Sequence, residues 1–429
     1  MPITAQQRAV AALGAGVLAA TLLAAVSAPA EAARACRIEV TTRIDAKERF
    51  AGPSIAKYVY ATANGSAVGQ FDHAANVIMT TYPQGAYPSL VNKKVGELEA
   101  VGSMLQSQAP TALGGINADF FVFADVRYET QMEMARGPMV KEGVVIRGTA
   151  QTKRVVGIDT LGQPYGGELG VRGFITPKVA KTPKVAIRSV NWHVLLDGGA
   201  NLYTTDWSGA KRTDGLAKYP RPAGVLEWVL NRRNKITSIR SASQNASLRG
   251  APVVRGTRVV AFSADTATTA GRVSLGTKIK VGVRQKTDTG TPLVTGVGRG
   301  LPIVEAGKPA PLGCGAYAKT SGAKAARPRT FVGWDGKGRW RTFTVPGTSV
   351  SSSGGKLVRA GGLGLANAAN VARALGMKYA YELDGGGSTS LWTRQRSVWS
   401  RQDLYGVSNP SHCVCERWMA NGLSFLPGP

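Results

Sequence analysis

The chain is poor in histidine and in acidic residues, and each shortage excludes a class of function. Its three histidines, His73, His193 and His412, stand too far apart to predict a histidine-based metal centre or a nucleophile triad. The 26 acidic residues are outnumbered by 53 lysines and arginines, which leaves a formal charge of +27 and predicts attraction to polyanions. The basic residues are scattered and are not interleaved with stacking aromatics, which argues against nucleic acid as the partner.

Cysteine is also scarce. The chain has four, Cys36, Cys314, Cys413 and Cys415. In an oxidising compartment an even number favours two disulfides, with three connectivities open. Cys413 and Cys415 are too close to bridge each other without strain, so each is expected to reach a distant partner. A zinc site at Cys413, Cys415 and His412 is the competing interpretation, although the usual second spaced pair is missing.

The amino terminus has the pattern of a secretory leader. Arg8 is followed by a nearly uncharged run over residues 9–26 and then by small residues that offer cleavage sites. We expect residues 1–35 to be a signal peptide and the mature protein to be secreted or cell-surface associated, with no stable membrane span after cleavage. The alternative is a retained anchor, because the run is just long enough to cross a bilayer.

Short β-branched runs separated by 53 glycines and 22 prolines predict many strands joined by turns. The expected fold class is α+β, a β-rich single large domain with a few helices packed on mixed or antiparallel sheets. Helices are expected over residues 95–108 and 364–375, the second capped by Gly376 and followed by a strand over residues 377–383. Residues 157–162 and 333–338 each combine Asp and Gly and predict β-hairpins.

A glycine-rich turn follows the expected strand 377–383, in the order Asp384-Gly385-Gly386-Gly387-Ser388-Thr389. Its glycines let backbone N–H groups face one concavity that can hold an anion, and the two hydroxyls add donors. A strand also puts Glu382 and Asp384 on one face, about 7 Å apart. Carboxylates at about that separation suit acid/base cleavage of a glycosidic bond. The alternative is a plain glycine hairpin with solvated acids.

Four motifs in order resemble the phosphodiester glycosidase family. They are Gly-Ile-Asn-Ala-Asp-Phe-Phe at 115–121, Gly-Pro-Met-Val-Lys-Glu-Gly at 137–143, Arg-Pro-Arg-Thr-Phe-Val-Gly at 327–333, and the 364–388 stretch that closes on Asp-Gly-Gly-Gly-Ser. The resemblance covers roughly residues 109–426. It implies an N-terminal β/α part over residues 36–108 and a phosphodiester glycosidase-like domain over 109–428. Short β-like runs that alternate over about residues 223–294 predict a β-rich middle lobe within that domain.

The resemblance implies a secreted hydrolase that cleaves a sugar-1-phosphodiester, releases the sugar and leaves a phosphomonoester. Asp384 and Glu382 are the expected catalytic carboxylates, and Arg329 is expected to bind the phosphate. Asn117 is expected to point its amide at the sugar or to fix the Asp384 loop. The remaining expected substrate contacts are Gly385, Gly386, Gly387, Ser388 and Thr389.

The expected partner is a phosphorylated glycan or an anionic cell-surface polymer, acting as substrate. No metal ligands and no required cofactor are predicted; calcium would suit carboxylates near the turn, but no 12-residue calcium loop is present. Two other functions stay open, a non-catalytic binder of anionic cell-surface polymer and a phosphodiesterase that acts on a non-sugar polymer.

Overall fold

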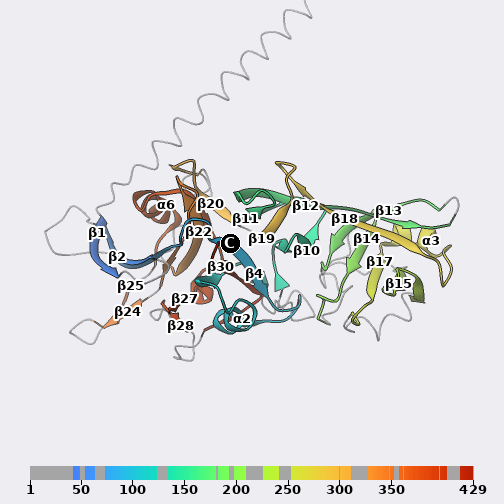
Figure 1. Ribbon diagram of the computed structural model, residues 1–429, viewed down its shortest axis with the longest axis horizontal. Helices are drawn as coiled ribbons and strands as arrows, with labels where there is room; N and C mark the ends of the chain where they lie inside the picture. Colours follow the sequence, from blue (N-terminus) through green and yellow to red (C-terminus); the bar gives the residue numbers. More distant parts are fainter. Residues whose placement is uncertain are drawn as a thin grey trace, which may run out of the picture.

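The computed structural model describes most of the chain between residues 42 and 428 (Figure 1). The described ranges are 42–48, 54–62, 73–122, 134–179, 182–192, 198–208, 226–240, 253–298, 300–310, 327–346, 348–351, 357–360, 362–395, 397–402 and 416–428. The expected leader, the four cysteines, His193 and His412 lie outside these ranges, and so do the disulfide and zinc hypotheses that depend on them. Within the described ranges, no helix has the length and apolarity needed to span a membrane.

Strands far outnumber helices, and the predicted β-rich α+β domain is confirmed. The largest sheet has eleven strands in the order β16 (Ile236–Arg240), β15 (Leu226–Leu230), β17 (Arg258–Phe262), β14 (Ala200–Tyr203), β13 (Val185–Val190), β10 (Val144–Thr149), β9 (Met139–Lys141), β19 (Leu293–Gly298), β11 (Lys153–Asp159), β12 (Pro164–Pro177) and β18 (Ile279–Thr287). An eight-stranded sheet has the order β1 (Thr42–Glu48), β2 (Ser54–Thr62), β3 (His73–Thr81), β23 (Trp340–Val345), β22 (Arg329–Asp335), β26 (Met377–Glu382), β20 (Leu301–Glu305) and β21 (Lys308–Pro309).

A five-stranded sheet lies beside the eight-stranded one. Its order is β28 (Val398–Arg401), β27 (Leu391–Gln395), β6 (Gly114–Asn117), β30 (Asn421–Leu426) and β4 (Tyr87–Asn92). Three two-stranded ribbons complete the described strands: β24 (Thr348–Ser351) with β25 (Leu357–Ala360), β29 (Trp418–Met419) with β5 (Glu99–Ala100), and β7 (Phe121–Val122) with β8 (Met134–Ala135).

The helix expected over residues 364–375 is confirmed as α6 (Leu365–Ala374). Gly376 follows its end with φ of 78°, a left-handed conformation that glycine adopts without steric cost, and its N–H caps the Arg373 carbonyl. The chain then enters β26 directly, as predicted. The apolar face of α6, including Leu365, Ala368 and Val371, packs in one core with Phe331 and Phe343 of the eight-stranded sheet, and this core supports the strand that leads to Asp384.

The helix expected over residues 95–108 is wrong in its first half, because α2 begins at Val101 (Val101–Gln108). Gly96 has φ of 97°, outside the helical region, and Val95 forms a bridge with Trp207. Residues 99–100 pair with β29 instead. Tertiary pairing therefore overrides a helical spacing of apolar residues. The other described helix is α3 (Ala264–Ala270).

Both predicted hairpins are confirmed, and they share one device. In the turn between β11 and β12, the Asp159 carboxylate accepts hydrogen bonds from the N–H groups of Leu161 and Gln163 at 2.9 and 2.8 Å. In the turn between β22 and β23, Asp335 accepts in the same way from Lys337 and Arg339, at 2.9 and 3.1 Å. The aspartate side chain replaces backbone acceptors in each turn, which explains its position in the sequence.

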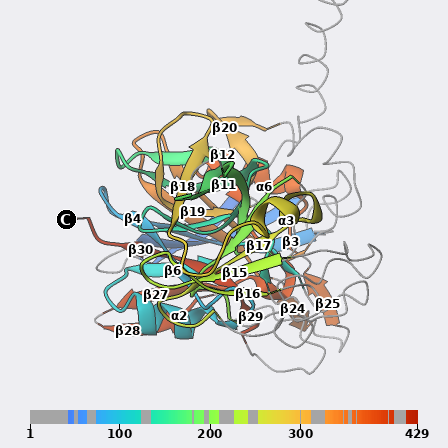
Figure 2. The ribbon, with the colours of Figure 1, turned by 90° about the vertical axis from the view of Figure 1, so that its right-hand side faces the viewer.

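The eleven-stranded sheet extends away from the other two sheets and ends in a lobe at the right of Figure 1; Figure 2 looks onto this lobe, with β15 and β17 in view. The apolar core of the lobe contains Val145 and Ile187 as well as Trp228 and Ile279, so it draws on strands before and within residues 223–294. The 14-residue strand β12 connects the lobe to the rest. The Tyr381 hydroxyl of β26 donates to the Gly166 carbonyl of β12 at 3.4 Å, and Ile175, farther along β12, lies in the lobe core.

Candidate active site

The predicted carboxylates lie where the eight-stranded and five-stranded sheets meet. Glu382 is the last residue of β26, and Asp384 follows it in the short loop before the 3₁₀ turn η2 (Gly386–Ser388). The Asp384 N–H donates to the Ala118 carbonyl, just beyond β6, at 2.9 Å. The Gly386 N–H donates to the Pro328 carbonyl, just before β22, at 2.8 Å. Strands from two sheets thus hold this loop from both sides.

Asn117 connects these strands from within the core. It is fully buried at the end of β6, and its Nδ2 donates to the Asp384 carbonyl oxygen at 2.7 Å. Its Oδ1 accepts from Thr330 Oγ1 at 2.7 Å and from the Ser390 N–H at 2.9 Å. Of the two roles expected for Asn117, these contacts fit the fixing of the Asp384 loop.

Arg329 and Glu382 form an ion pair inside the protein. Their side chains are only 3% and 5% exposed, and the Arg329 guanidinium donates to the Glu382 carboxylate and, through Nε, to the Leu363 carbonyl. Burial raises the pKa of Glu382, and the charge of Arg329 opposes that shift. A buried pair of this kind is costly to break, because the remaining charge loses its partner away from water. Arg329 therefore lies in the predicted site with its guanidinium engaged by Glu382.

Asp384 has the electrostatics of a group that gains and loses a proton near neutral pH. Burial raises its pKa from an ordinary 3.8 to about 6, and the Glu382 carboxylate adds to the rise. The Ser388 hydroxyl, the Gly385 N–H and the charge of Arg417 lower the pKa and offset part of it. A carboxyl with a pKa near the working pH is suited to general acid or base catalysis.

The glycine turn uses most of its amides inside the protein. The N–H groups of Gly385, Gly386, Ser388 and Thr389 all donate to protein oxygens, the first to the Asp384 carboxylate at 2.9 Å. In this conformation an anion at the turn would contact side chains before backbone amides. The Thr389 hydroxyl is buried and makes no hydrogen bond within the described part of the chain, so it is available to a ligand.

Arg417 is a site residue that the sequence did not indicate. Its charge acts on Asp384, and a Cβ added to Gly387 would lie 2.9 Å from its Cζ atom, so the guanidinium packs against the glycine turn. Arg417 is half-buried and directly precedes β29. It reaches the site because β29 pairs with β5 and β30 pairs with β6, and no local sequence pattern signals those contacts.

A second charged group lies beneath the loop. Asp119 is fully buried, and its carboxylate accepts from the Gly137 N–H at 2.7 Å. Burial lowers the pKa of Arg147, on β10, to about 9, and the Asp119 charge opposes this. The Arg147 guanidinium also lies over the Trp192 ring, 4.1 Å from its centroid. These contacts join the loop after β6 to the eleven-stranded sheet.

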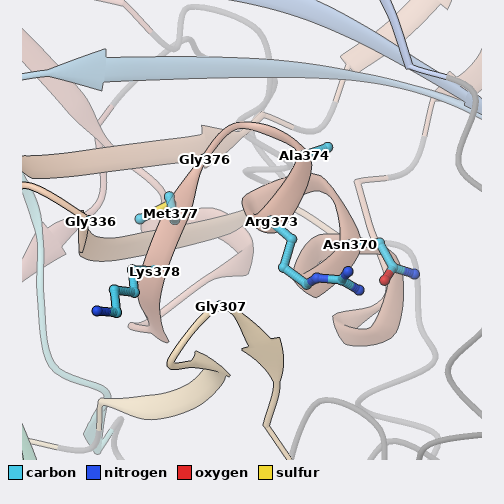
Figure 3. A pocket seen from close by; sticks show the side chains of 8 residues that line it. All are labelled: Gly307, Gly336, Asn370, Arg373, Ala374, Gly376, Met377 and Lys378. Atoms are coloured by element: carbon cyan, nitrogen blue, oxygen red, sulfur yellow. The ribbon is translucent and has the colours of Figure 1, made fainter.

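A surface depression lies around Met377 and Lys378, at the start of β26 (Figure 3). It is lined by Gly307, Gly336, Asn370, Arg373, Ala374, Gly376, Met377 and Lys378. Met377 begins β26 and Glu382 ends it, so the two places are separated by the length of a six-residue strand, about 17 Å. This depression is therefore not part of the carboxylate site.

Residues 228–426 match the family model described as phosphodiester glycosidase. The predicted resemblance to the phosphodiester glycosidase family is confirmed. The matched range contains Arg329, Glu382, the glycine turn and Arg417, whereas Asn117 precedes it. No curated protein matches the chain by sequence.

Two solved structures share the fold at low identity. A hypothetical protein from Synechocystis is 17% identical with a TM-score of 0.61; the alignment covers 91% of this chain and 64% of that one, so this chain spans less than two thirds of its length. A protein from Burkholderia pseudomallei that is described as a putative exported protein is 16% identical with a TM-score of 0.61, over 94% of this chain and 89% of that one. The catalytic domain of zebrafish N-acetylglucosamine-1-phosphodiester alpha-N-acetylglucosaminidase is 13% identical with a TM-score of 0.43, over 91% and 88%.

Proposed function

We propose that this protein is a phosphodiester glycosidase that hydrolyses a sugar-1-phosphodiester, releasing the sugar and leaving a phosphomonoester. The observation that carries the proposal is the Asp384 carboxyl, whose pKa of about 6 lies near neutrality beside a cation and a second carboxylate. The match of residues 228–426 to the phosphodiester glycosidase family model supports the same reaction class.

Asp384 acts as the general acid in this proposal. In its protonated form it donates a proton to the oxygen that links the anomeric carbon to phosphorus, while the C–O bond breaks and water adds to the anomeric carbon. The linking oxygen leaves with the phosphate, and the sugar takes its new hydroxyl from water. Glu382 keeps a negative charge close to Asp384, which helps to hold the proton on Asp384 until the bond breaks.

Two arginines have different roles in the proposed site: one binds the phosphate and the other pairs with Glu382. Arg417 packs against the turn beside Asp384 and is the cation that a bound phosphate meets first. Arg329, predicted from the sequence as the phosphate ligand, is engaged with Glu382 and would contact a phosphate only on releasing that carboxylate. We propose that it holds Glu382 in position and adds positive charge to the site. The Thr389 hydroxyl contributes a further substrate contact.

The site of action that we propose is outside the cytoplasm. The basic and apolar amino terminus supports export, and the structurally similar Burkholderia protein is described as exported. Sequencing the amino terminus of the protein recovered from the medium or cell surface checks this. We expect the leader to be missing, with the mature chain beginning near residue 36.

Hydrolysis in water enriched in ¹⁸O tests the reaction directly. A panel of sugar-1-phosphodiesters is incubated with the protein, with and without chelator, and the products are analysed by mass spectrometry. Label in the sugar hydroxyl is the expected result, because the C–O bond breaks. Label in the phosphate means that the P–O bond breaks and would favour a phosphodiesterase. Absence of turnover on every member, with or without chelator, would favour a non-catalytic binder.

A further inference from the structure

The outward face of the β12–β18 pair, in the lobe, is strongly cationic. β12 and β18 run antiparallel, and their register puts Arg172 directly opposite Arg284 and Gly170 opposite Lys286. Lys280 lies farther along the same face of β18, opposite Thr176. All four charged side chains are exposed, and within the described part of the chain none has a carboxylate partner at ion-pair distance.

The arrangement puts like charges next to each other, which is unfavourable in a sheet. Arginines directly opposite on adjacent strands repel each other, because their Cβ atoms are about 5 Å apart. Arg188 of β13 extends the row, because β13 also pairs with β12. In that pairing Ile187 is opposite Gly173, so Arg188 comes next to Arg172. The nearest outward acid on β12 is Glu168, and it accepts a hydrogen bond from Thr152 beyond the end of the row. A bound anion would relieve the repulsion that this face carries alone.

An apolar platform interrupts the cations. Phe174 is 43% exposed and pairs with Gly282, above which no atom lies within 4 Å of an added Cβ. The surface over Gly282, beside Phe174, is therefore open, one outward position along from the Arg172–Arg284 pair. Successive outward positions on a strand are about 7 Å apart. Along the face, charged side chains that can bind phosphates thus lie on both sides of an aromatic side chain that can contact a sugar ring.

This face is remote from the carboxylate site and belongs to a strand pair that packs on the lobe core. The inward residues of the same strands, Val171, Ile175 and Ile279, lie in the lobe core. β18 is the last strand in the described sheet order, and its first residue, Ile279, donates its N–H to the Asn234 carbonyl at 2.8 Å. In Figure 1 β18 and β13 lie to the right, while β22 and β27, which flank the carboxylates, lie to the left.

We propose that the outward face of β12 and β18 is a second site, which binds a phosphodiester-linked glycan polymer in an extended form. From Lys280 to Lys286 the cations of β18 span about 20 Å, enough for several repeats of such a chain. The polymer's phosphates contact the arginines and lysines, and a sugar ring packs on Phe174. Nucleic acid fits less well, because single-strand sites use several stacking aromatics and the described face offers one. The inference rests on the proposed function only for the choice of polymer.

Charge reversal at the paired arginines tests the second site. R172E/R284E is compared with R373E/K308E, which makes the same change in net charge on exposed residues of α6 and β21, away from the lobe. Binding to a sugar-phosphate polymer is measured by calorimetry at several salt concentrations. We expect R172E/R284E to weaken binding at least tenfold and to flatten its salt dependence, and the control pair to change it less than threefold. F174A is expected to weaken binding without changing the salt dependence.

Two outcomes would overturn the second site. Equal weakening by R373E/K308E would mean that net charge, and not this face, attracts the polymer. Single-stranded DNA of equal charge is measured beside the polymer. The assignment to a glycan polymer would be overturned if the DNA bound the unmodified protein as tightly as the polymer does and lost as much affinity in R172E/R284E. The proposed function fails separately: polymer binding by D384N is expected to equal that of the unmodified protein, and hydrolysis of a small sugar-1-phosphodiester by R172E/R284E is expected to stay within twofold.

Discussion

The Asn117 side-chain amide donates a hydrogen bond of 2.7 Å to the main-chain carbonyl of Asp384, 267 positions later in the chain. The same side chain accepts from Thr330 and Ser390, so one buried residue of β6 holds β22 and both ends of the glycine turn. The position of Asp384 thus depends on a side chain that, in the proposed reaction, we do not expect to touch the reacting atoms.

Asn117→Ala should lower both stability and turnover. Three hydrogen bonds are lost, and each is worth about 1 kcal/mol net, with a further cost for the buried groups left unpaired, so we expect a loss of about 2–4 kcal/mol in the free energy of unfolding. Urea denaturation measures this, and kcat on a soluble substrate measures turnover. The matched control is N201A, another fully buried asparagine, in β14 of the lobe. It should lose stability and keep kcat; equal kcat losses in both variants would contradict the positioning role.

Asp384→Asn should stabilise the fold above pH 6 while abolishing hydrolysis. Burial raises the pKa of Asp384 from 3.8 to about 6, so between these values the folded state binds the proton more tightly than the unfolded state. Stability therefore falls as pH rises through this window. A pKa difference of about two corresponds to about 3 kcal/mol. This is the upper limit of the increase in the free energy of unfolding that we expect for D384N, whose amide stays neutral.

Denaturation of D384N at pH 4 and pH 8 checks the sign. The gain should be present at pH 8 and should vanish near pH 4. Asp265→Asn is the control of opposite sign, because a hydrogen bond with Ser263 lowers the pKa of the exposed Asp265. D265N should lose stability at pH 8. If D384N gains nothing at pH 8, the carboxyl is not held in the environment described above.

Arg417→Met should weaken substrate binding and shift the pH dependence of turnover. Loss of a charged hydrogen bond to the phosphate is worth about 1.5–3 kcal/mol, so KM should rise roughly ten- to a hundredfold. With Asp384 as the acid, kcat falls above about pH 6; removal of the Arg417 charge raises the pKa of Asp384 and moves this fall to higher pH. R394M, on β27, is the control and should change neither. An increase in KM with no shift of the pH profile would mean that the charge of Arg417 does not act on the Asp384 carboxyl.

The Arg329–Glu382 pair should be strongly coupled in a double-mutant cycle. Glu382→Gln leaves a buried guanidinium without its counter-charge and should cost about 3–5 kcal/mol of stability. Arg329→Met strands the carboxylate and should cost a similar amount. The double variant R329M/E382M should recover much of the loss, because neither charge remains. Additive losses, measured by urea denaturation, would mean that the two side chains act independently.

The sequence predicted the local features of the site well. α6, the Gly376 cap, β26 and both hairpins depend on neighbouring residues, such as Asp335 within its own turn, and local patterns are sufficient to find them. Residues 95–108 show the limit of this approach. Their apolar spacing suits a helix, but Val95 bridges to Trp207 and residues 99–100 pair with β29, and neither contact has a local signal.

The contacts that define the chemistry are almost all long-range. Arg329 and Glu382 meet because β22 pairs with β26 in a register that puts Phe331 opposite Glu382. Arg417 reaches the glycine turn from the end of the chain through two further strand pairings. Residue types and family motifs could nominate Arg329 and Asp384, but strand register decides which partner each one has.

The long strand β12 sets a limit on engineering. Its first part contacts Tyr381, next to Glu382 at the end of β26, and the strand continues into the core of the cationic lobe. A chimera that exchanges this lobe for one from a relative cannot be joined inside residues 164–177 without interrupting the strand that connects the lobe to the rest of the protein. Viable junctions must lie outside β12, and under the two proposals above a recombinant made that way would change polymer binding and leave hydrolysis of a small substrate unchanged.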